Sequence, residues 1–310
     1  MNKIIITGAL GHIGSALIRY LPKKIENLDI IIIDDLSTQR FGSLFKLPKN
    51  SKFKFIFQDI KKIKNNEIFK DARVLIHLSA QTDASSSFEN PKKLYKNNLD
   101  STKFVIKKCI KFNIPLIFAS TTSVYGTQKK SIDEKCSKKD LKPQSPYAEC
   151  KLKEEDVIKS SNKKLKYTIF RFGTIYGISP GMRFHTAVNK FCFASANNLP
   201  LTVWKTAYNQ KRPYLDLQDC LNVITFFILN NIFDSKIYNV VTDNLSVKDI
   251  INLIKKYNNK VKIKFVDHKI MNQLSYEVKN YELSKTKFKF KGNIKKGIED
   301  TLKLLEYKNG

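Results

Sequence analysis

Residues 3–14, Lys-Ile-Ile-Ile-Thr-Gly-Ala-Leu-Gly-His-Ile-Gly, decide the fold class because they join a short apolar run to a Gly-x-x-Gly-x-x-Gly turn. The β-branched run is typical of a buried strand, and residues 15–21 continue with apolar side chains at helical spacing. An ordinary tight turn would use the same residue types. The order strand, glycine turn, helix favours a dinucleotide site, because glycines let the backbone approach a pyrophosphate and a helix start offers N–H donors. The residues expected to contact the dinucleotide here are Gly8, Gly11, His12, Ile13 and Gly14.

A second apolar run, residues 29–33, ends in two carboxylates, Asp34 and Asp35. An acidic residue about twenty positions past the glycines is placed to accept hydrogen bonds from the adenosine ribose. Because this carboxylate would repel a 2′-phosphate, Asp34 favours NAD over NADP. Arg40, six residues later, weakens that preference slightly.

Strands and helices then alternate as far as residue 175. Strands are expected at 53–57, 74–78, 114–119 and 167–170, and helices at 91–112 and from Tyr147 onward. This alternation predicts an α/β fold of the Rossmann type, a doubly wound parallel sheet, with residues 1–175 as an NAD-binding domain.

The regular alternation of strands and helices ends after Gly177. Helices are expected at 184–196, 217–229, 247–257 and 294–307, and strands at 201–204, 211–216, 237–241 and 260–266, with Ser246 and Asp249 capping the third of these helices. We expect residues 176–310 to form a smaller α/β substrate-binding domain, with the 213–242 segment returning to the first domain.

Tyr147 and Lys151 lie four residues apart at the start of an expected helix, so both face the same side, one turn from each other. A nearby ammonium lowers the pKa of a tyrosine from about 10, and such a phenol can exchange a proton with a hydroxyl. The pair alone is weak evidence, since an exposed helix start with a solvated lysine would look the same. The hydroxyl-rich segment 120–126 supports the functional interpretation, because it follows a strand at the edge where ligands bind.

The formal charge of +28 raises the possibility of a nucleic-acid or membrane partner. However, the lysines are spread along the whole chain, and arginine is scarce. We therefore favour a compositional bias from which an anionic substrate benefits, with no nucleic acid and no membrane as partner. No apolar run reaches about 18 residues, and the N-terminus lacks the features of a signal peptide.

The five cysteines are widely spaced, without a Cys-x-x-Cys pair or a histidine at zinc-ligand spacing. We expect reduced thiols in a cytoplasmic protein and no metal site.

These pieces together resemble the extended short-chain dehydrogenase/reductase family, specifically its NAD-dependent sugar-nucleotide epimerases and dehydratases. The resemblance covers nearly the whole chain, and its markers occur in the expected order: Thr-Gly-x-x-Gly-x-x-Gly at 7–14, Asp34, Asp59-Ile60, residues 77–80, Asn98 with Thr102, 120–126, Tyr147 with Lys151, 171–177 and 212–219. No single marker is specific to this family, whereas the complete set in this order is strong evidence for the resemblance.

The resemblance implies roles for individual residues. Thr121 matches the hydroxyl that hydrogen-bonds the sugar oxygen, Tyr147 the acid/base, and Lys151 the residue that holds the nicotinamide ribose. Further expected cofactor contacts are Asp59, Ile60, Leu78, Ala80 and Asn98. Expected substrate contacts, in addition to Thr121, are Gln81, Thr174, Arg183 and Arg212, of which Arg212 would grip the diphosphate.

The resemblance also implies a mechanism. Tyr147, as phenolate, would take a proton from a sugar hydroxyl while hydride passes from that carbon to NAD⁺, and a 4-epimerase would return the hydride to the other face. The 4,6-dehydratases carry Asp-Glu after the threonine, where this chain has Thr122-Ser123. Thr174 and the segment 204–206 also depart from common members, and both touch the expected sugar pocket.

The leading hypothesis is therefore an NAD-dependent sugar-nucleotide 4-epimerase. An NAD(P)H-dependent reductase of keto-sugar nucleotides is the alternative, and a non-catalytic nucleotide- or RNA-binding member of the fold is a remote one. By resemblance we expect a homodimer formed through helices near 91–112 and 146–160.

Overall fold

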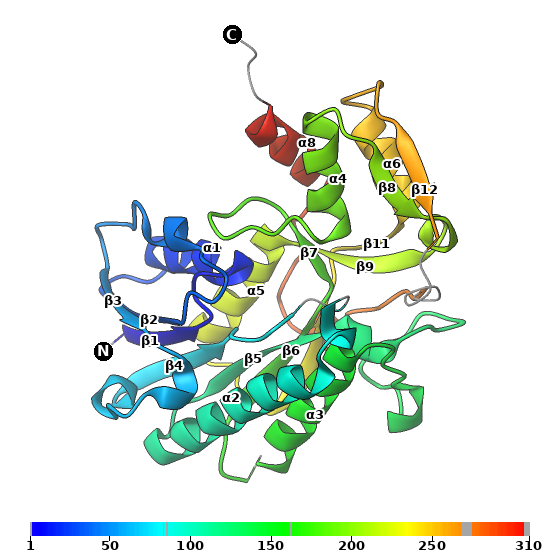
Figure 1. The fold of residues 1–310 in the computed structure, drawn as a ribbon. Helices are drawn as coiled ribbons and strands as arrows, with labels where there is room; N and C mark the ends of the chain where they lie inside the picture. The colour runs from blue at the N-terminus through cyan, green and yellow to red at the C-terminus, as the bar shows by residue number, and fades with distance from the viewer. Residues whose placement is uncertain (1, 83, 85, 162, 268–274, 307–310) are drawn as a thin grey trace.

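A seven-stranded parallel sheet forms the centre of the computed structural model, which describes residues 2–82, 84, 86–161, 163–267 and 275–306 (Figure 1). Its strands lie in the order β3-β2-β1-β4-β5-β6-β10, each parallel to its neighbours. They are β1 (Asn2–Thr7), β2 (Leu28–Asp34), β3 (Lys52–Phe57), β4 (Ala72–His77), β5 (Leu116–Thr121), β6 (Tyr167–Phe172) and β10 (Lys236–Val240). The predicted Rossmann-type doubly wound sheet is confirmed.

Helices cover both faces of this sheet. α1 (His12–Tyr20) and α5 (Leu217–Leu229) pack on the face where Ile4 and Ile6 are buried. α2 (Pro91–Phe112) and α3 (Pro146–Ser160) lie side by side on the face where Ile5 is buried (Figure 1). Burial on both faces explains why the strands read as nearly continuous apolar runs. Within the described residues, no helix has both the length and the apolar surface needed to cross a bilayer.

A smaller layer lies beside the large sheet (Figure 1). β9 (Lys211–Asp216) pairs in parallel with β7 (Thr174–Tyr176) and antiparallel with β11 (Asp243–Ser246), and β8 (Leu201–Trp204) pairs in parallel with β12 (Ile263–Val266). α4 (Ala187–Ala196), α6 (Val247–Lys255) and α8 (Ile294–Leu305) share one apolar core with them. The one-turn helix α7 (Tyr281–Ser284) contacts β10.

Several element boundaries differ from the predicted ones. α1 begins at His12 rather than at residue 15, because Gly11 already occupies the N-cap position. α4 begins at Ala187 instead of 184, and α6 ends at Lys255 instead of 257. α8 ends at Leu305, and residue 307, the predicted end, lies outside the described residues. β11 was not predicted.

The capping prediction for α6 is confirmed. Ser246 accepts a hydrogen bond from the Asp249 N–H, and the Asp249 carboxylate accepts one from the Ser246 N–H. Two elements from late in the sequence join the first half of the chain: β10 pairs with β6 in the large sheet, and α5 packs against α1 on one face of that sheet. The division of the chain at residue 175 stays a prediction.

The loop after β7 packs directly on the glycine turn after β1. The Gly181 N–H donates a hydrogen bond to Ser15 Oγ (2.9 Å). A Cβ at Gly181 would lie 2.3 Å from the carbonyl oxygen of Leu10 and 2.6 Å from that of Gly11. Such distances are far inside van der Waals contact, so only a glycine permits this approach.

We expect Gly181→Ala to lower the free energy of unfolding by about 1–3 kcal/mol, because the added methyl group meets backbone atoms that cannot move aside. Urea denaturation measures the change. Gly42→Ala is the matched control, since no atom lies within 4 Å of its Cβ position, and it should leave stability unchanged or slightly raised. Equal losses in the two variants would contradict the packing argument.

Candidate active site

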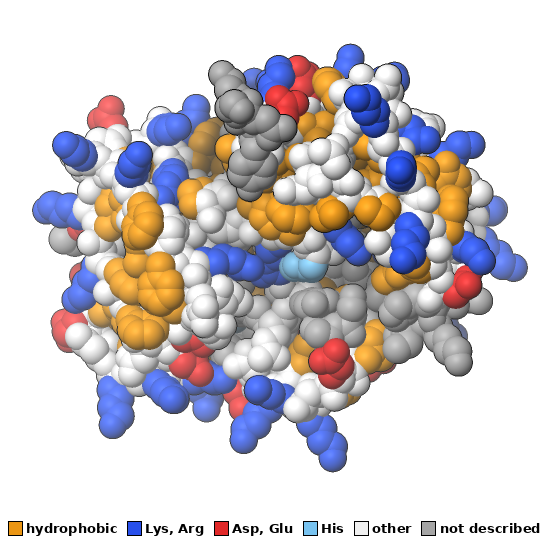
Figure 2. Space-filling view, turned by 45° about the horizontal axis from the view of Figure 1, so that its top comes forward, with side chains coloured by type: hydrophobic (Ala, Val, Ile, Leu, Met, Phe, Trp, Pro, Cys, Tyr) orange, Lys and Arg blue, Asp and Glu red, His pale blue; other side chains and the backbone are white. Residues whose placement is uncertain are grey.

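A cavity of about 720 Å³ opens where the carboxyl ends of the parallel strands face the smaller layer. Figure 2 shows the molecule hollowed at its centre, with basic and histidine side chains inside the hollow. Most of the residues predicted for cofactor, substrate and catalysis line this one cavity. They are Gly8, Gly11, His12, Ile13, Gly14, Asp34, Leu78, Ala80, Thr121, Tyr147, Lys151, Thr174, Arg183 and Arg212.

The Asp34 side chain connects the glycine turn to the end of β2. One carboxylate oxygen accepts the Leu10 N–H (3.0 Å) and the other accepts the Leu36 N–H (2.9 Å). Burial raises the pKa of Asp34, and these two N–H donors oppose the shift. Gly8 has a φ of +64°, and a Cβ there would lie 2.6 Å from the Ser79 nitrogen. The turn therefore requires its first glycine, and Asp34 holds the turn while it also lines the cavity.

Asp59, Ile60, Gln81 and Asn98 do not line the cavity, in contrast to the other predicted site residues. Asp59 accepts the Lys61 N–H and ion-pairs with the Lys61 ammonium, while Ile60 is buried in the core. Asn98 bridges the backbone of Gln81, accepting its N–H and donating to its carbonyl oxygen. Asn98 therefore holds the loop after β4 in place, and direct contacts from these four residues stay predictions.

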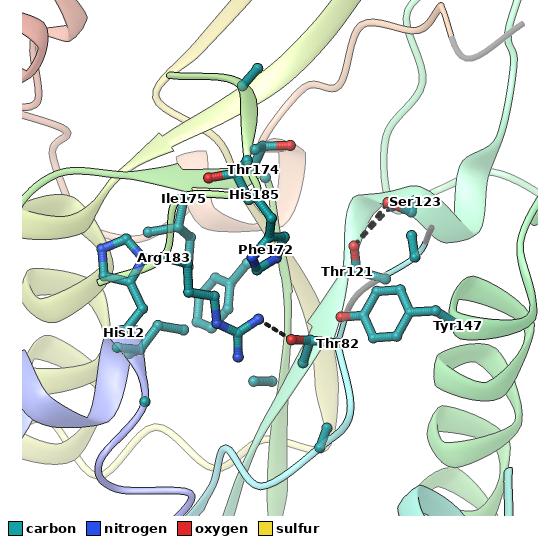
Figure 3. A pocket seen from close by; sticks show the side chains of 18 of the residues that line it. His12, Thr82, Thr121, Ser123, Tyr147, Phe172, Thr174, Ile175, Arg183 and His185 are labelled. Atoms are coloured by element: carbon teal, nitrogen blue, oxygen red, sulfur yellow. Dashed lines mark hydrogen bonds between the residues drawn. The ribbon is translucent and has the colours of Figure 1, made fainter. Parts of the chain in front are cut away.

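Tyr147 sits in the first turn of α3, where Ser145 caps the helix by accepting the Ala148 N–H. Its ring points into the cavity toward Thr121 (Figure 3). Thr121 ends β5, donates to Ser123 Oγ (3.2 Å) and accepts the Ser123 N–H (3.1 Å). The hydroxyl groups of Thr121 and Tyr147 thus reach the same space from a strand end and a helix start.

The expectation of a lowered tyrosine pKa is wrong for this structure. Burial raises the pKa of Tyr147, the Lys151 ammonium acts to lower it, and the Glu154 carboxylate acts to raise it. Desolvation of the phenolate at the cavity wall is the larger effect, and the spacing of Tyr147 and Lys151 in the sequence does not reveal it.

Glu154 is the functional candidate that the sequence interpretation missed. Its side chain is fully buried, and one carboxylate oxygen lies 3.2 Å from Lys151 Nζ. The next residue, Glu155, is equally buried and forms a bidentate pair with Arg171 (2.9 and 2.7 Å). A glutamate three positions after Lys151 was a usable signal, because i and i+3 share a helix face.

Arginine side chains reach the cavity from the second half of the chain. Arg183, from the loop before α4, donates to Thr82 Oγ1 on the opposite wall (Figure 3). Arg212, on β9, has its Nε and Nη2 atoms buried without a hydrogen-bond partner. Because buried guanidinium groups need acceptors, Arg212 fits an anionic ligand group such as a phosphate.

Further polar groups shape the cofactor end. His12 Nε2 lies 2.8 Å from the Gly177 carbonyl oxygen, and burial lowers the pKa of His12 to about 4, so the neutral ring donates this hydrogen bond. The first-turn N–H groups of α1 have no partner within the helix and suit a diphosphate. Together with Asp34, this arrangement fits NAD. Among the residues that the structure describes, no three His, Cys, Asp or Glu side chains gather as a metal ion would require.

Comparison with known proteins decides the family. A sequence model of the NAD dependent epimerase/dehydratase family matches residues 4–240, which is most of the chain. The chain belongs to the NAD-dependent epimerase/dehydratase family. The family and fold recognised from the ordered motifs are thereby confirmed.

Relatives within this family include both epimerases and dehydratases. The chain is 32% identical over 276 residues to a dTDP-D-glucose 4,6-dehydratase of Dictyostelium discoideum, a match that covers 82% of this chain but only 62% of that protein. It is 30% identical over 233 residues to an uncharacterized UDP-glucose epimerase of Bacillus subtilis, covering 72% and 71% of the two chains. The UDP-glucuronic acid 4-epimerase of Bacillus cereus, solved with UDP-glucuronic acid and NAD, superposes with a TM-score of 0.87 at 25% identity, over 98% of this chain and 99% of that one.

Beneath the cavity, His77 is buried between two hydroxyl groups. Its Nδ1 lies 2.7 Å from Thr7 Oγ1 and its Nε2 lies 3.3 Å from Thr102 Oγ1. Burial lowers the pKa of His77 to about 3, and the nearby Lys151 ammonium contributes to the shift. The folded protein therefore keeps His77 neutral, whereas the unfolded chain protonates it below a pH of about 6.5.

This difference predicts acid sensitivity. Between a pH of about 6.5 and about 3, His77 is protonated in the unfolded chain but neutral in the folded protein. The free energy of unfolding therefore falls as the pH falls. At pH 5 the expected loss from His77 is about 2 kcal/mol relative to neutral pH. Urea denaturation across this range measures it, with His77→Gln as the variant that should lose this part of the pH dependence. An identical pH dependence in both proteins would contradict the prediction.

Proposed function

We propose that this protein is an NAD-dependent sugar-nucleotide 4-epimerase. The observation that carries the proposal is that Thr121, Tyr147 and Lys151 line one cavity together with the glycine turn and Asp34. A hydroxyl group, a phenol and an ammonium there can bind one sugar hydroxyl and move its proton. NAD, when bound, supplies the hydride acceptor and donor.

The proposed roles follow from position. Tyr147 exchanges the proton of the reacting sugar hydroxyl, and Thr121 hydrogen-bonds the same oxygen. Lys151 holds the cofactor ribose and provides positive charge beside the phenol. Backbone N–H groups at the start of α1 and the Asp34 carboxylate orient the cofactor, because they present donors and acceptors at the edge of the sheet where the cavity opens.

An epimerase is favoured over a dehydratase by the residues after Thr121. Thr122 is buried, donates to the Phe172 carbonyl oxygen (3.3 Å) and lies 3.4 Å from the Tyr276 hydroxyl. The carboxylates among the described lining residues are Asp34 and Asp35, at the end of β2. Elimination of water needs a second acid/base pair near the sugar, and hydroxyl groups occupy the position where the resemblance places it in dehydratases.

The proposed substrate is a nucleotide-diphosphate sugar. Arg212 offers unpartnered guanidinium nitrogen atoms to a diphosphate, and Arg183 lines the same cavity. UDP-sugars are the first candidates, because UDP-glucuronic acid is bound in the similar Bacillus cereus epimerase. Reduction of a keto-sugar nucleotide is the alternative, and it differs in consuming reduced cofactor at each turnover.

Two further parts of the proposal concern the protein in the cell. A homodimer is proposed through α2 and α3, which lie side by side on one face of the sheet. A cytoplasmic location is proposed because all five cysteines are unpaired.

We expect Tyr147→Phe to lower kcat by about 10²- to 10⁴-fold while NAD still binds, because the substitution removes only the proton-transferring hydroxyl. The assay incubates the protein with a panel of UDP-, dTDP-, GDP- and CDP-sugars and identifies products by NMR of the sugar ring. Tyr257→Phe is the matched control. This hydroxyl lies on the surface and bonds Glu299 (3.1 Å), so turnover should be unchanged.

The product distinguishes the alternatives. An epimerase gives a sugar nucleotide of unchanged mass with no net change in NADH. A product lighter by one water would identify a dehydratase, and stoichiometric NADH oxidation would identify a reductase. Full turnover by Tyr147→Phe would overturn the assignment of Tyr147.

A further inference from the structure

A continuous line of buried polar side chains runs from the glycine turn to the catalytic helix. Thr7, on β1, lies 2.7 Å from His77 on β4, and His77 lies 3.3 Å from Thr102 on α2. Thr102 donates to one carboxylate oxygen of Glu154 (2.5 Å), and Lys151 Nζ lies 3.2 Å from the other. The line joins the element that begins the cofactor site to the lysine beside Tyr147.

The direction of these hydrogen bonds can be assigned. The Thr102 hydroxyl hydrogen goes to the Glu154 carboxylate, so Thr102 Oγ1 is left to accept from His77 Nε2–H. The neutral His77 ring then accepts the Thr7 hydroxyl hydrogen at Nδ1, and Thr7 Oγ1 in turn accepts the Ser79 N–H (3.3 Å). Every donor points toward Glu154, whose Oε1 atom is the acceptor at the end of the line.

Lys151 and Glu154 are nearly inaccessible to water, with side-chain exposures of 4% and 0%. A buried ammonium loses its hydration and needs a compensating charge. Burial acts to lower the pKa of Lys151, but Glu154, followed by Tyr147 and Cys150, acts in the other direction, and the pKa is raised. The Lys151 ammonium also lies 4.5 Å from the centre of the Phe118 ring, which provides weaker support.

The charged and titratable groups facing Tyr147 come from two elements. From α3 these are Lys151, Glu154 and the Cys150 thiol, and from the loop before α4 it is Arg183. From β4, His77 faces Lys151 but stays neutral. Glu154 is thus the carboxylate that opposes the two cations acting on Tyr147.

We propose that Glu154 is a positioning residue for the reaction: it anchors the Lys151 ammonium beneath the cavity and offsets part of the positive charge that Lys151 directs at Tyr147. The inference rests on the proposed role of Tyr147 as acid/base. Two consequences follow. Lys151 is held in place although it is buried, and the proton affinity of Tyr147 is set by the lysine–glutamate pair rather than by the lysine alone.

Glu155 provides an internal comparison. It is the next residue of the same helix, is equally buried, and also carries an ion pair and a hydroxyl donor, from Arg171 and Ser120. Its carboxylate is committed to Arg171 and does not contact Lys151 in the ion pairs found. The two glutamates therefore match in burial and charge and differ in whether they face the catalytic lysine.

The test is a pH titration of Tyr147 in the full chain without substrate, followed by NMR of tyrosine isotope-labelled at Cζ, with Tyr147→Phe to assign the signal. Glu154→Gln keeps a side chain of the same shape and removes the charge, so we expect the titration midpoint to fall by about 1 pH unit. Glu154→Asp withdraws the charge by one methylene group and should give a smaller fall. Glu155→Gln should leave the midpoint unchanged even where it lowers the melting temperature.

The proposal is supported if the titration midpoint of Tyr147 is highest in the wild type, lower in Glu154→Asp and lowest in Glu154→Gln. A midpoint in Glu154→Gln that equals the wild-type value, or lies above it, overturns the proposal. If Glu154→Gln does not fold, Glu154→Asp decides by the same criterion. Since the titration needs no turnover, an absence of epimerase activity would refute the proposed function without changing this result.

Discussion

Parallel strands bring their carboxyl ends to one edge of a sheet, and this constraint organises the whole molecule. From β1 the chain proceeds to β2 and β3 on one side, and from β4 to β5, β6 and β10 on the other. Connections therefore leave β1 and β4 in opposite directions and leave a crevice between them. The glycine turn, the loop after β4 and the end of β5 all meet at this crevice. The smaller layer then closes it into a cavity.

Burying charged side chains beneath that cavity costs free energy, so the buried charges have to be paired. Two adjacent glutamates of α3 are fully buried, one with Lys151 and the other with Arg171. Removing one partner of such a pair costs about 3–5 kcal/mol, because a bare charge remains. The Glu155–Arg171 pair therefore ties α3 to β6, whereas the Lys151–Glu154 pair lies within α3 itself. Lys151, held in this way, is already in place before any ligand arrives.

The parts of this picture that sequence could predict are those built from short, local patterns. The run 3–14 specified a strand, a turn and a helix because the residues that form them are adjacent. Tyr147 and Lys151 were recognisable because a helix places them one turn apart. The roles of Asn98 and Gly181 were not predictable, because each depends on what lies opposite in three dimensions, and the helical spacing of Glu154 from Lys151 did not show that its carboxylate is buried. Glu154 faces Thr102 on another helix, and Gly181 touches a turn about 170 residues earlier. The lowered pKa expected for Tyr147 failed for the same reason, since desolvation depends on the enclosure and not on the neighbouring residues in sequence.

The two ends of the cavity consequently differ in how the chain builds them. The cofactor end is mostly backbone from one strand–turn–helix unit, which its glycines and Asp34 hold in shape. The other end is made of side chains from separate segments, among them Thr174 after β6, Arg212 on β9 and Tyr276 near the C-terminal end. Thr174 and Arg212 belong to paired strands of the smaller layer, and the Tyr276 hydroxyl lies 3.4 Å from Thr122 Oγ1 after β5. Chemistry common to a family can therefore persist at one end while substrate choice changes at the other, and the Thr122-Ser123 pair and Thr174 belong to that other end.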